Sequence, residues 1–219
     1  MNSIYDITLK FPRRMLIYGP SGSGKSTFVE KMLFYMKDLF GFNFDNIVYC
    51  SGESFPAFDE IFGLSINKVR IFNKELLEEF NSENKNLLIL DDNMHSFVND
   101  KLISDLFTKI SHHKNIFVIF LVQNLFPKGK YIRDLSTNST YIVLMSNPRE
   151  NLQIRTLSSQ IDGADPKFVL NCYTFATKNK PYAYLFLDFD QETPVEIRVR
   201  TNIFPDEETT IAFVKISQV

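Results

Sequence analysis

The chain has 219 residues, and its 24 lysines and arginines against 26 acidic residues leave a formal net charge of −2. This balance excludes the strongly basic surface of proteins that coat nucleic acids, so any contact with DNA must be local or shared among subunits. The two cysteines, Cys50 and Cys172, stand far apart without C-x-x-C or histidine companions, which argues against a disulfide framework and a zinc site.

The length of the chain predicts a single domain over residues 1–219. The longest apolar run, IFVIFLV at residues 116–122, is far too short to span a bilayer. No charged-then-apolar secretory pattern stands at the N-terminus. We therefore expect a soluble, intracellular protein.

The segment YGPSGSGKSTF at residues 18–28 fits the phosphate-binding pattern G-x-x-x-x-G-K-[ST]. Its glycines permit a curled backbone whose N–H groups point at phosphate oxygens, and the following helix adds the positive end of its dipole. Lys25 is predicted to reach the β- and γ-phosphates, and Ser26 to place its hydroxyl on Mg²⁺. The residues predicted to bind the nucleotide are Gly19, Pro20, Ser21, Gly22, Ser23, Gly24, Lys25, Ser26 and Thr27.

Apolar runs alternate with helical patterns along the chain, which is typical of a mostly parallel sheet covered by helices on both faces. Strands are predicted at 15–18, 46–50, 68–72, 87–90, 116–122 and 141–145. Helices are predicted after the phosphate-binding loop (Phe28, Met32, Met36, Leu39), over 74–80, around Leu102, Ile103, Leu106 and Ile110, and over 149–161. Residues 182–189 and 195–201 alternate like an antiparallel pair joined through QETP, so an edge hairpin is predicted to finish the sheet.

An acidic pair follows the apolar run LLIL at residues 87–90. A phosphate-binding loop needs a metal ligand opposite it, so Asp91 is predicted to hold Mg²⁺ through water and Asp92 to orient or deprotonate the attacking water. A pair of acids after a strand also serves to cap a following helix. The pattern predicts a P-loop NTPase.

Gln123 ends the wholly apolar strand at 116–122. In P-loop proteins that insert a strand between the phosphate-loop strand and the metal-ligand strand, the ASCE type, a polar side chain at this point faces the γ-phosphate. Gln123 is therefore predicted to sense that phosphate. An amide that satisfies loop backbone at a strand end explains the same residue.

Arg133, Arg149 and Arg155 all follow the strand that ends at Gln123. An arginine finger at the transition state is worth about 10³ to 10⁵ in rate, and a neighbouring subunit often supplies it. Arg149, in SNPRE just beyond the strand at 141–145, is the first choice for this finger, and Arg133 is the second. Taken alone, each arginine is explained as a solvated surface residue.

Five blocks of the sequence form a recognisable set: GPSGSGKST, LLILDD, SHHKNIFVIFLVQNLF, STYIVLMSNPRE and IRVRTNIFP. Together they resemble the genome-packaging ATPases of the FtsK/HerA superfamily, and most of all the branch found in poxviruses and other large DNA viruses, virophages and Polinton (Maverick) elements. The likeness covers residues 15–205. Its first two blocks are generic, whereas the HHKN-to-QNLF and NPRE blocks are more specific.

The resemblance implies a homo-oligomeric ring, a pentamer or hexamer, that uses ATP and Mg²⁺ to move double-stranded DNA into a preformed capsid. Its phosphate-loop lysine falls on Lys25, its metal-ligand aspartate on Asp91, its catalytic acid on Asp92 and its sensor glutamine on Gln123. Most of the superfamily carries Asp-Glu where this chain has Asp-Asp. Capsid or portal vertex proteins are the implied partners, at the virus assembly site in the host cell or at the virion vertex.

Weak phosphate contacts from a few cations per subunit suit a motor that steps along DNA. The candidates to line a DNA channel are Lys128, Lys130 and Arg133, or Arg70 and Lys74. Ordinary solvated charge explains each of them singly.

Three other functions share the phosphate-binding loop. A small kinase for nucleotides or metabolites has similar length, but it needs an arginine-rich lid, and the sequence contains no compact lid. A GTPase needs an Asn/Thr-Lys-x-Asp signature, and the nearest matches, TKNK at 177–180 and NKEL at 73–76, lack the final aspartate. A nucleotide that only holds an assembly together is the third alternative.

Overall fold

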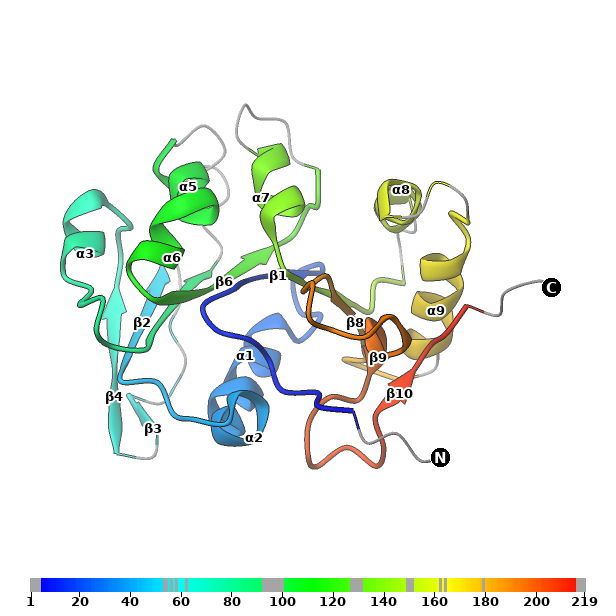
Figure 1. The fold of residues 1–219 in the computed structure, drawn as a ribbon, viewed down its shortest axis with the longest axis horizontal. Coiled ribbons are helices and arrows are strands. Elements are labelled where there is room, and N and C mark those ends of the chain that lie inside the picture. Colours follow the sequence, from blue (N-terminus) through cyan, green and yellow to red (C-terminus); the bar gives the residue numbers. More distant parts are fainter. Residues whose placement is uncertain are drawn as a thin grey trace.

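The computed structural model describes residues 5–52, 55, 57, 59–61, 63–91, 101–126, 132–148, 152–161, 163, 165–178 and 180–215, with the backbone alone at 132–134. These residues build a ten-stranded sheet in the order β10-β9-β8-β7-β1-β6-β5-β2-β4-β3 (Figure 1). The strands are β1 (Arg14–Tyr18), β2 (Asn46–Ser51), β3 (Glu60–Ile61), β4 (Leu64–Val69), β5 (Asn86–Asp91), β6 (Ile116–Val122), β7 (Tyr141–Met145), β8 (Tyr184–Asp188), β9 (Val199–Thr201) and β10 (Ile211–Ala212).

Strands β7, β1, β6, β5, β2 and β4 run parallel, and β3, β8, β9 and β10 pair antiparallel with their neighbours. Strand β6 therefore lies between the strand that leads into the phosphate-binding loop and β5, which ends at Asp91. The mostly parallel sheet and the inserted strand confirm the predicted fold class.

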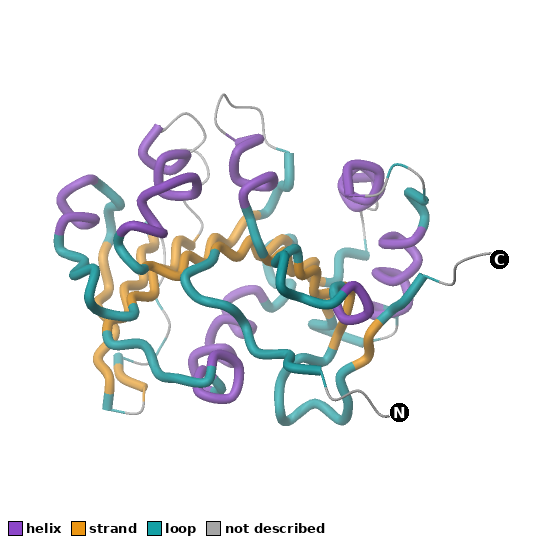
Figure 2. The backbone as a smooth tube through the Cα atoms, viewed as in Figure 1, coloured by secondary structure: helices purple, strands orange, loops and turns teal. Residues whose placement is uncertain are grey.

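Helices cover both faces of the sheet (Figures 1 and 2). They are α1 (Lys25–Phe34), α2 (Met36–Phe40), α3 (Lys74–Glu78), α5 (Lys101–Asp105), α6 (Ser111–His113), α7 (Ile132–Asn138), α8 (Leu152–Ile161) and α9 (Phe168–Thr177), with a π-helical turn η1 (Leu106–Ile110) and a 3-10 turn η2 (Val195–Ile197). Helices α1 and α2 lie on one face, and the remaining α-helices lie on the other (Figure 1). None of the helices in the described ranges is long and apolar enough to cross a membrane.

Alternating side chains of the central strands feed two separate cores. In β1, Met15 and Ile17 pack with the residues of α1 and α2, whereas Leu16 and Tyr18 pack with the helices of the opposite face. Both layers exclude water from β1, since residues 15–18 are all buried. This two-sided burial explains why the central strands read as continuous apolar runs.

Two strand predictions need correction. The strand predicted at 68–72 is β4, which begins at Leu64 and ends at Val69, because its pairing with β2 stops at Cys50 opposite Val69. The predicted C-terminal hairpin forms, with Phe186 opposite Arg200, but its second strand is only β9. Residues 195–197 instead form η2, and β10 pairs outside β9, so the hairpin is not the last pair of the sheet.

Helices form at all four predicted places, but their extents differ. The single helix predicted after the phosphate-binding loop is interrupted at Tyr35, so it forms α1 and α2. The helix predicted over 74–80 is α3, which ends at Glu78, and the one predicted over 149–161 is described from Leu152 onward as α8. The helix predicted around Leu102 to Ile110 comprises α5, η1 and α6 in succession.

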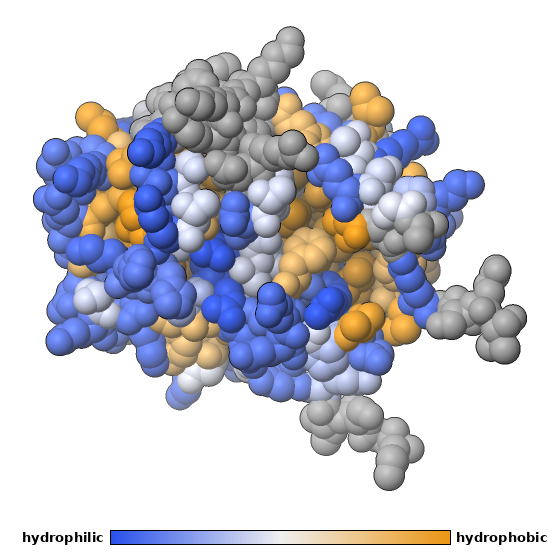
Figure 3. Space-filling model, turned by 45° about the horizontal axis from the view of Figure 1, so that its top comes forward, coloured by the Kyte–Doolittle hydropathy of each residue, from blue (hydrophilic) through white to orange (hydrophobic). Residues whose placement is uncertain are grey.

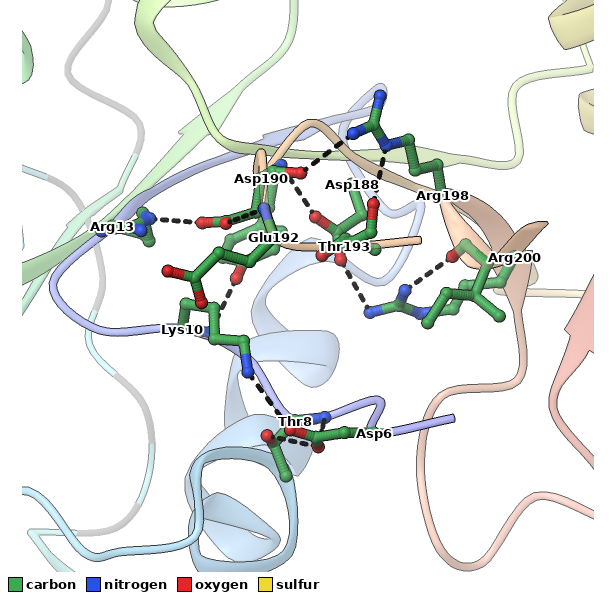
Figure 4. A network of polar contacts seen from close by, with 12 residues as sticks. Asp6, Thr8, Lys10, Arg13, Asp188, Asp190, Glu192, Thr193, Arg198 and Arg200 are labelled. Atoms are coloured by element: carbon green, nitrogen blue, oxygen red, sulfur yellow. Dashed lines mark hydrogen bonds and ion pairs between the residues drawn. The ribbon is translucent and has the colours of Figure 1, made fainter. Parts of the chain in front are cut away.

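A polar network joins the N-terminal segment to the β8–β9 connection (Figure 4). Arg13 forms an ion pair with Asp190, and Asp188 forms one with Arg200 at 3.1 Å. The Asp188 and Arg200 side chains are 3% and 1% exposed, so this second pair is fully inside the protein. Breaking either side of such a pair leaves an uncompensated buried charge, which makes the network structural.

Candidate nucleotide-binding site

The phosphate-binding loop connects the end of β1 to the start of α1. The Gly19 N–H donates to the Val122 carbonyl at 3.1 Å, which fixes the start of the loop against β6. Gly22 and Gly24 have φ angles of 74° and 93°, a region that residues with a side chain rarely adopt. These two glycines let the backbone curl just before the first turn of α1.

Close packing at Gly19 keeps the loop narrow. A Cβ at this position would lie 2.4 Å from Ser23 Oγ and 2.7 Å from Met145 Cβ, so no larger residue fits without a shift. Within the described residues, the buried Ser23 hydroxyl has no hydrogen-bond partner. A buried hydroxyl of this kind in a glycine-rich loop is a group that a phosphate oxygen satisfies.

Lys25 directs its ammonium group into the curve of the loop. Its Nζ donates to the carbonyls of Gly19 at 2.8 Å and Pro20 at 3.0 Å. The ammonium and the first N–H groups of α1 are thus gathered at one point, and this arrangement favours an anion. The loop fits a polyphosphate.

Ser26 and Asp91 come from different elements and meet at one side of the loop. The Ser26 hydroxyl, in the first turn of α1, donates to Asp91 Oδ2 at 3.4 Å. Asp91 is the last residue of β5 and is 8% exposed. Hydroxyl and carboxylate oxygens are the ligands that Mg²⁺ prefers, so this pair fits the predicted metal site. Its role in binding a metal stays a prediction.

Tyr49 is a member of this cluster that the sequence analysis missed. Its hydroxyl donates to Asp91 Oδ2 at 2.5 Å from the neighbouring strand β2. Burial, followed by the Asp91 charge, raises the pKa of Tyr49, so the phenol remains a neutral donor. In the sequence Tyr49 looks like one more buried residue of NIVYC, because only strand pairing brings β2 beside β5.

Gln123 follows β6 at the same edge of the sheet. It is exposed, and the preceding residue, Val122, accepts the hydrogen bond from Gly19. Strand β6 lies between β1, which leads into the loop, and β5, which ends at Asp91. Gln123 therefore lies between the loop and Asp91 in the order of the strands. This is the position that a γ-phosphate sensor needs, and that role stays a prediction.

Two further hydrogen bonds hold the segments that follow β6 and β7. Gln153 of α8 accepts a hydrogen bond from the Leu125 N–H at 2.7 Å, just beyond Gln123. The Asn147 side chain donates to the Tyr18 hydroxyl at 3.5 Å, at the end of β1. The first bond ties the segment after β6 to α8, and the second ties the segment after β7 to the end of β1, where the loop begins. Neither contact follows from a local sequence pattern.

Several predicted residues lie outside what the structure describes. Asp92 and Arg149 are among them, as are Lys128 and Lys130. Arg133 belongs to α7, where its backbone alone is described. The roles predicted for these residues stay predictions.

The remaining predicted cations are described. Arg155 is an exposed residue of α8. Arg70 lies over the Phe55 ring at 4.4 Å, and Lys74 pairs with Glu78 at 3.4 Å. A role in DNA contact or as a finger stays a prediction for each of them.

A cavity of about 870 Å³ lies away from the phosphate-binding loop. It is formed by α7, α8, α9 and the C-terminal strands, and it includes Leu157, Phe168 and Leu187. Figure 3 shows apolar side chains gathered on this side of the molecule. None of the residues of the phosphate-binding loop lines this cavity, so size alone does not locate the candidate site.

The sheet order and the loop geometry together define a P-loop NTPase fold. Among solved structures, the genome packaging NTPase B204 from Sulfolobus turreted icosahedral virus 2, in complex with ATP-gammaS, is similar with a TM-score of 0.60 at 13% identity, covering 86% of this chain and 95% of that chain. Its complex with AMPPCP gives a TM-score of 0.55 at 13% identity, covering 86% and 96%. The DNA-packaging ATPase B204 from Sulfolobus Turreted Icosahedral Virus gives 0.55 at 14%, covering 81% and 93%.

No protein-family model and no curated protein matches the sequence. At such low identities the likeness to B204 concerns the fold. It agrees with the fold expected from the resemblance to viral packaging ATPases and confirms that expectation.

Proposed function

We propose that this chain is an ATP-driven motor that moves double-stranded DNA into a preformed viral capsid. The observation that carries the proposal is the convergence of the phosphate-binding loop, Asp91 and Gln123 at the carboxyl ends of β1, β5 and β6. The likeness in fold to a protein named as a genome packaging NTPase supports it. We propose that residues 1–219 act as a single ATPase domain in a pentameric or hexameric ring.

Each residue of the candidate site has a separate role in the proposed hydrolysis of ATP. The loop N–H groups and Lys25 bind the β- and γ-phosphates, and Ser26 and Asp91 would hold Mg²⁺, which neutralises phosphate charge when bound. Asp92 orients or deprotonates the attacking water, and Gln123 senses the γ-phosphate. Hydrogen bonds from Ser26 and Tyr49 fix the direction of the Asp91 carboxylate before nucleotide arrives.

An arginine from the neighbouring subunit completes the site in this proposal, with Arg149 as first choice and Arg133 as second. Mixing Lys25→Ala subunits with Arg149→Ala subunits tests the idea. Each variant alone is expected to be inactive, whereas mixed rings contain interfaces with an intact loop and an intact arginine. Recovered hydrolysis identifies the finger, and recovery only with Arg133→Ala subunits would move the assignment to Arg133.

The decisive experiment measures ATP hydrolysis by the wild type and by Lys25→Ala, with and without duplex DNA. We expect stimulation by DNA in the wild type and no hydrolysis by the variant. Phosphoryl transfer to a nucleoside monophosphate would identify a kinase instead. Equal rates for the two proteins would leave the nucleotide a purely structural role. DNA translocation is then tested by displacement of a triplex strand from duplex DNA.

A further inference from the structure

A second cavity, of about 690 Å³, adjoins the phosphate-binding loop on the side away from Asp91. Its lining combines Gly24 and Thr27 of the loop and α1 with Met145, Tyr182 and Phe204. We propose that this cavity binds the nucleoside part of the nucleotide, with the base packed against the Tyr182 ring. The inference rests on the proposed function and assigns the part of the ligand that the phosphate-binding loop does not hold.

The order of the strands fixes the direction in which a bound nucleotide must lie. Asp91 ends β5 and Gln123 follows β6, and both strands lie on one side of β1. The cavity lies on the other side, where Met145 ends β7 and Tyr184 begins β8. A triphosphate whose terminal group reaches Asp91 and Gln123 therefore has its sugar and base directed toward β7 and β8.

Tyr182 presents an aromatic face at the junction of the loop and the cavity. Its side chain packs on the loop, because a Cβ at Gly24 would lie 2.9 Å from Tyr182 Cδ1. Its φ of 60° is a left-handed conformation that tyrosine rarely adopts, and 65% of the residue is exposed. A strained backbone that holds an exposed ring in place is typical of a ligand-contacting residue.

Contacts among other lining residues hold a further part of the cavity wall in place. The Tyr184 hydroxyl donates to Glu207 Oε2 at 2.7 Å, and Lys31 of α1 pairs with Asp206 at 2.9 Å. The Lys31 ammonium also lies 4.7 Å from the centre of the Phe204 ring. These contacts join the segment after β9 to β8 and to α1, so this part of the wall is formed before a base binds.

The charge of the lining indicates which part of the nucleotide enters. The lining carries three acids, Asp206, Glu207 and Glu208, against two cations, Lys31 and Lys180. This excess of acid disfavours phosphate groups, which the loop and Lys25 attract instead. An uncharged nucleoside fits an apolar cavity with polar groups at its rim.

Isothermal titration with MgATP and with inorganic tripolyphosphate separates the two parts of the ligand. For Tyr182→Ala we expect the affinity for MgATP to fall about tenfold, since stacking of a base on an aromatic ring is worth about 1–3 kcal/mol by alanine substitution. The affinity for tripolyphosphate should not change. Tyr182→Phe keeps the ring and should bind MgATP like the wild type.

Phe175→Ala is the matched control, because Phe175 is 64% exposed on α9 and does not line the cavity. Unchanged MgATP affinity in Tyr182→Ala, or an equal loss for both ligands, would overturn the nucleoside subsite alone. A wild type that binds neither ligand would overturn the proposed function, and the subsite with it. Melting temperatures of the variants show whether each one is folded.

Discussion

Two buried aspartates with the same local sequence pattern have different surroundings. Asp91 ends β5 after the run NLLIL, and Asp188 ends β8 after the run YLFL. Because β8 runs antiparallel to β7, with Tyr141 opposite Asp188, the two carboxylates lie at opposite edges of the sheet. Asp91 thus meets the phosphate-binding loop, whereas Asp188 meets the N-terminal polar network (Figure 4).

The two carboxylates also differ in the groups that hold them. Asp91 accepts hydrogen bonds from the hydroxyls of Ser26 and Tyr49, and Asp188 faces the Arg200 guanidinium. Hydroxyls orient a carboxylate without neutralising it, whereas a guanidinium neutralises it within the fold. We therefore expect Asp91 to matter for catalysis and Asp188 for stability.

The largest effect on activity is expected from Asp91→Asn. Its ATP hydrolysis should fall by about 10²- to 10³-fold, because a metal ion contributes several kcal/mol of transition-state stabilisation and the amide is a weak metal ligand. Steady-state phosphate release measures this, with the melting temperature as a check on folding. A rate within a few-fold of the wild type would remove Asp91 from the catalytic site.

Arg200→Met should act on stability instead. It leaves the Asp188 carboxylate buried without its partner, which costs about 3–5 kcal/mol of unfolding free energy. Urea denaturation measures the loss. The double variant with Asp188→Leu should recover much of it, and the nucleotide affinity of the folded protein should equal that of the wild type. Reduced nucleotide affinity in the double variant would show that the network also shapes the site.

Tyr49→Phe tests whether the hydrogen bond from the Tyr49 hydroxyl positions the Asp91 carboxylate. Loss of one hydrogen bond to a metal ligand typically costs about 10–100-fold in metal affinity, so the Mg²⁺ dependence of nucleotide binding should shift to higher concentration. Affinity for ATP in EDTA should be preserved. Tyr141→Phe is the matched control, since Tyr141 is also buried and its hydroxyl accepts from the Lys10 N–H at 2.7 Å. Equal Mg²⁺ dependence in both variants would deny Tyr49 this positioning role.

The smallest effect concerns pH and the Arg13–Asp190 pair. Burial acts to raise the pKa of Asp190, but the hydrogen bond from Arg13 and neighbouring donors hold it below its ordinary value of 3.8. A lowered pKa gives stability that is present above about pH 4 and is lost as the pH falls. Arg13→Gln should thus cost about 1–2 kcal/mol at pH 7 and less at pH 3, by urea denaturation. A constant difference at both pH values would show that the charge of Asp190 is not involved.

The candidate site was predictable where its residues form a continuous motif. The loop 19–27 follows an apolar strand and precedes a helix, and each of these signals lies within a few residues of the next. Asp91 was predictable because a phosphate-binding loop requires a metal ligand after a buried strand. Tyr49 and Tyr182 were not predictable, since each comes to the loop from a distant part of the chain and belongs to no local sequence motif.

By itself, the sequence determined the parallel α/β class, the phosphate-binding loop and the strand that ends at Asp91, because apolar periodicity and glycine spacing act over neighbouring residues. Only the tertiary structure decided the antiparallel direction of β8, the pairing of β2 with β5 that brings Tyr49 to Asp91, and the cavity beside Gly24. Those features depend on contacts between residues far apart in the chain. Such contacts form when strands pair and helices pack. An apolar run that ends in aspartate can place its carboxylate at either end of the parallel strands, depending on the direction of its own strand.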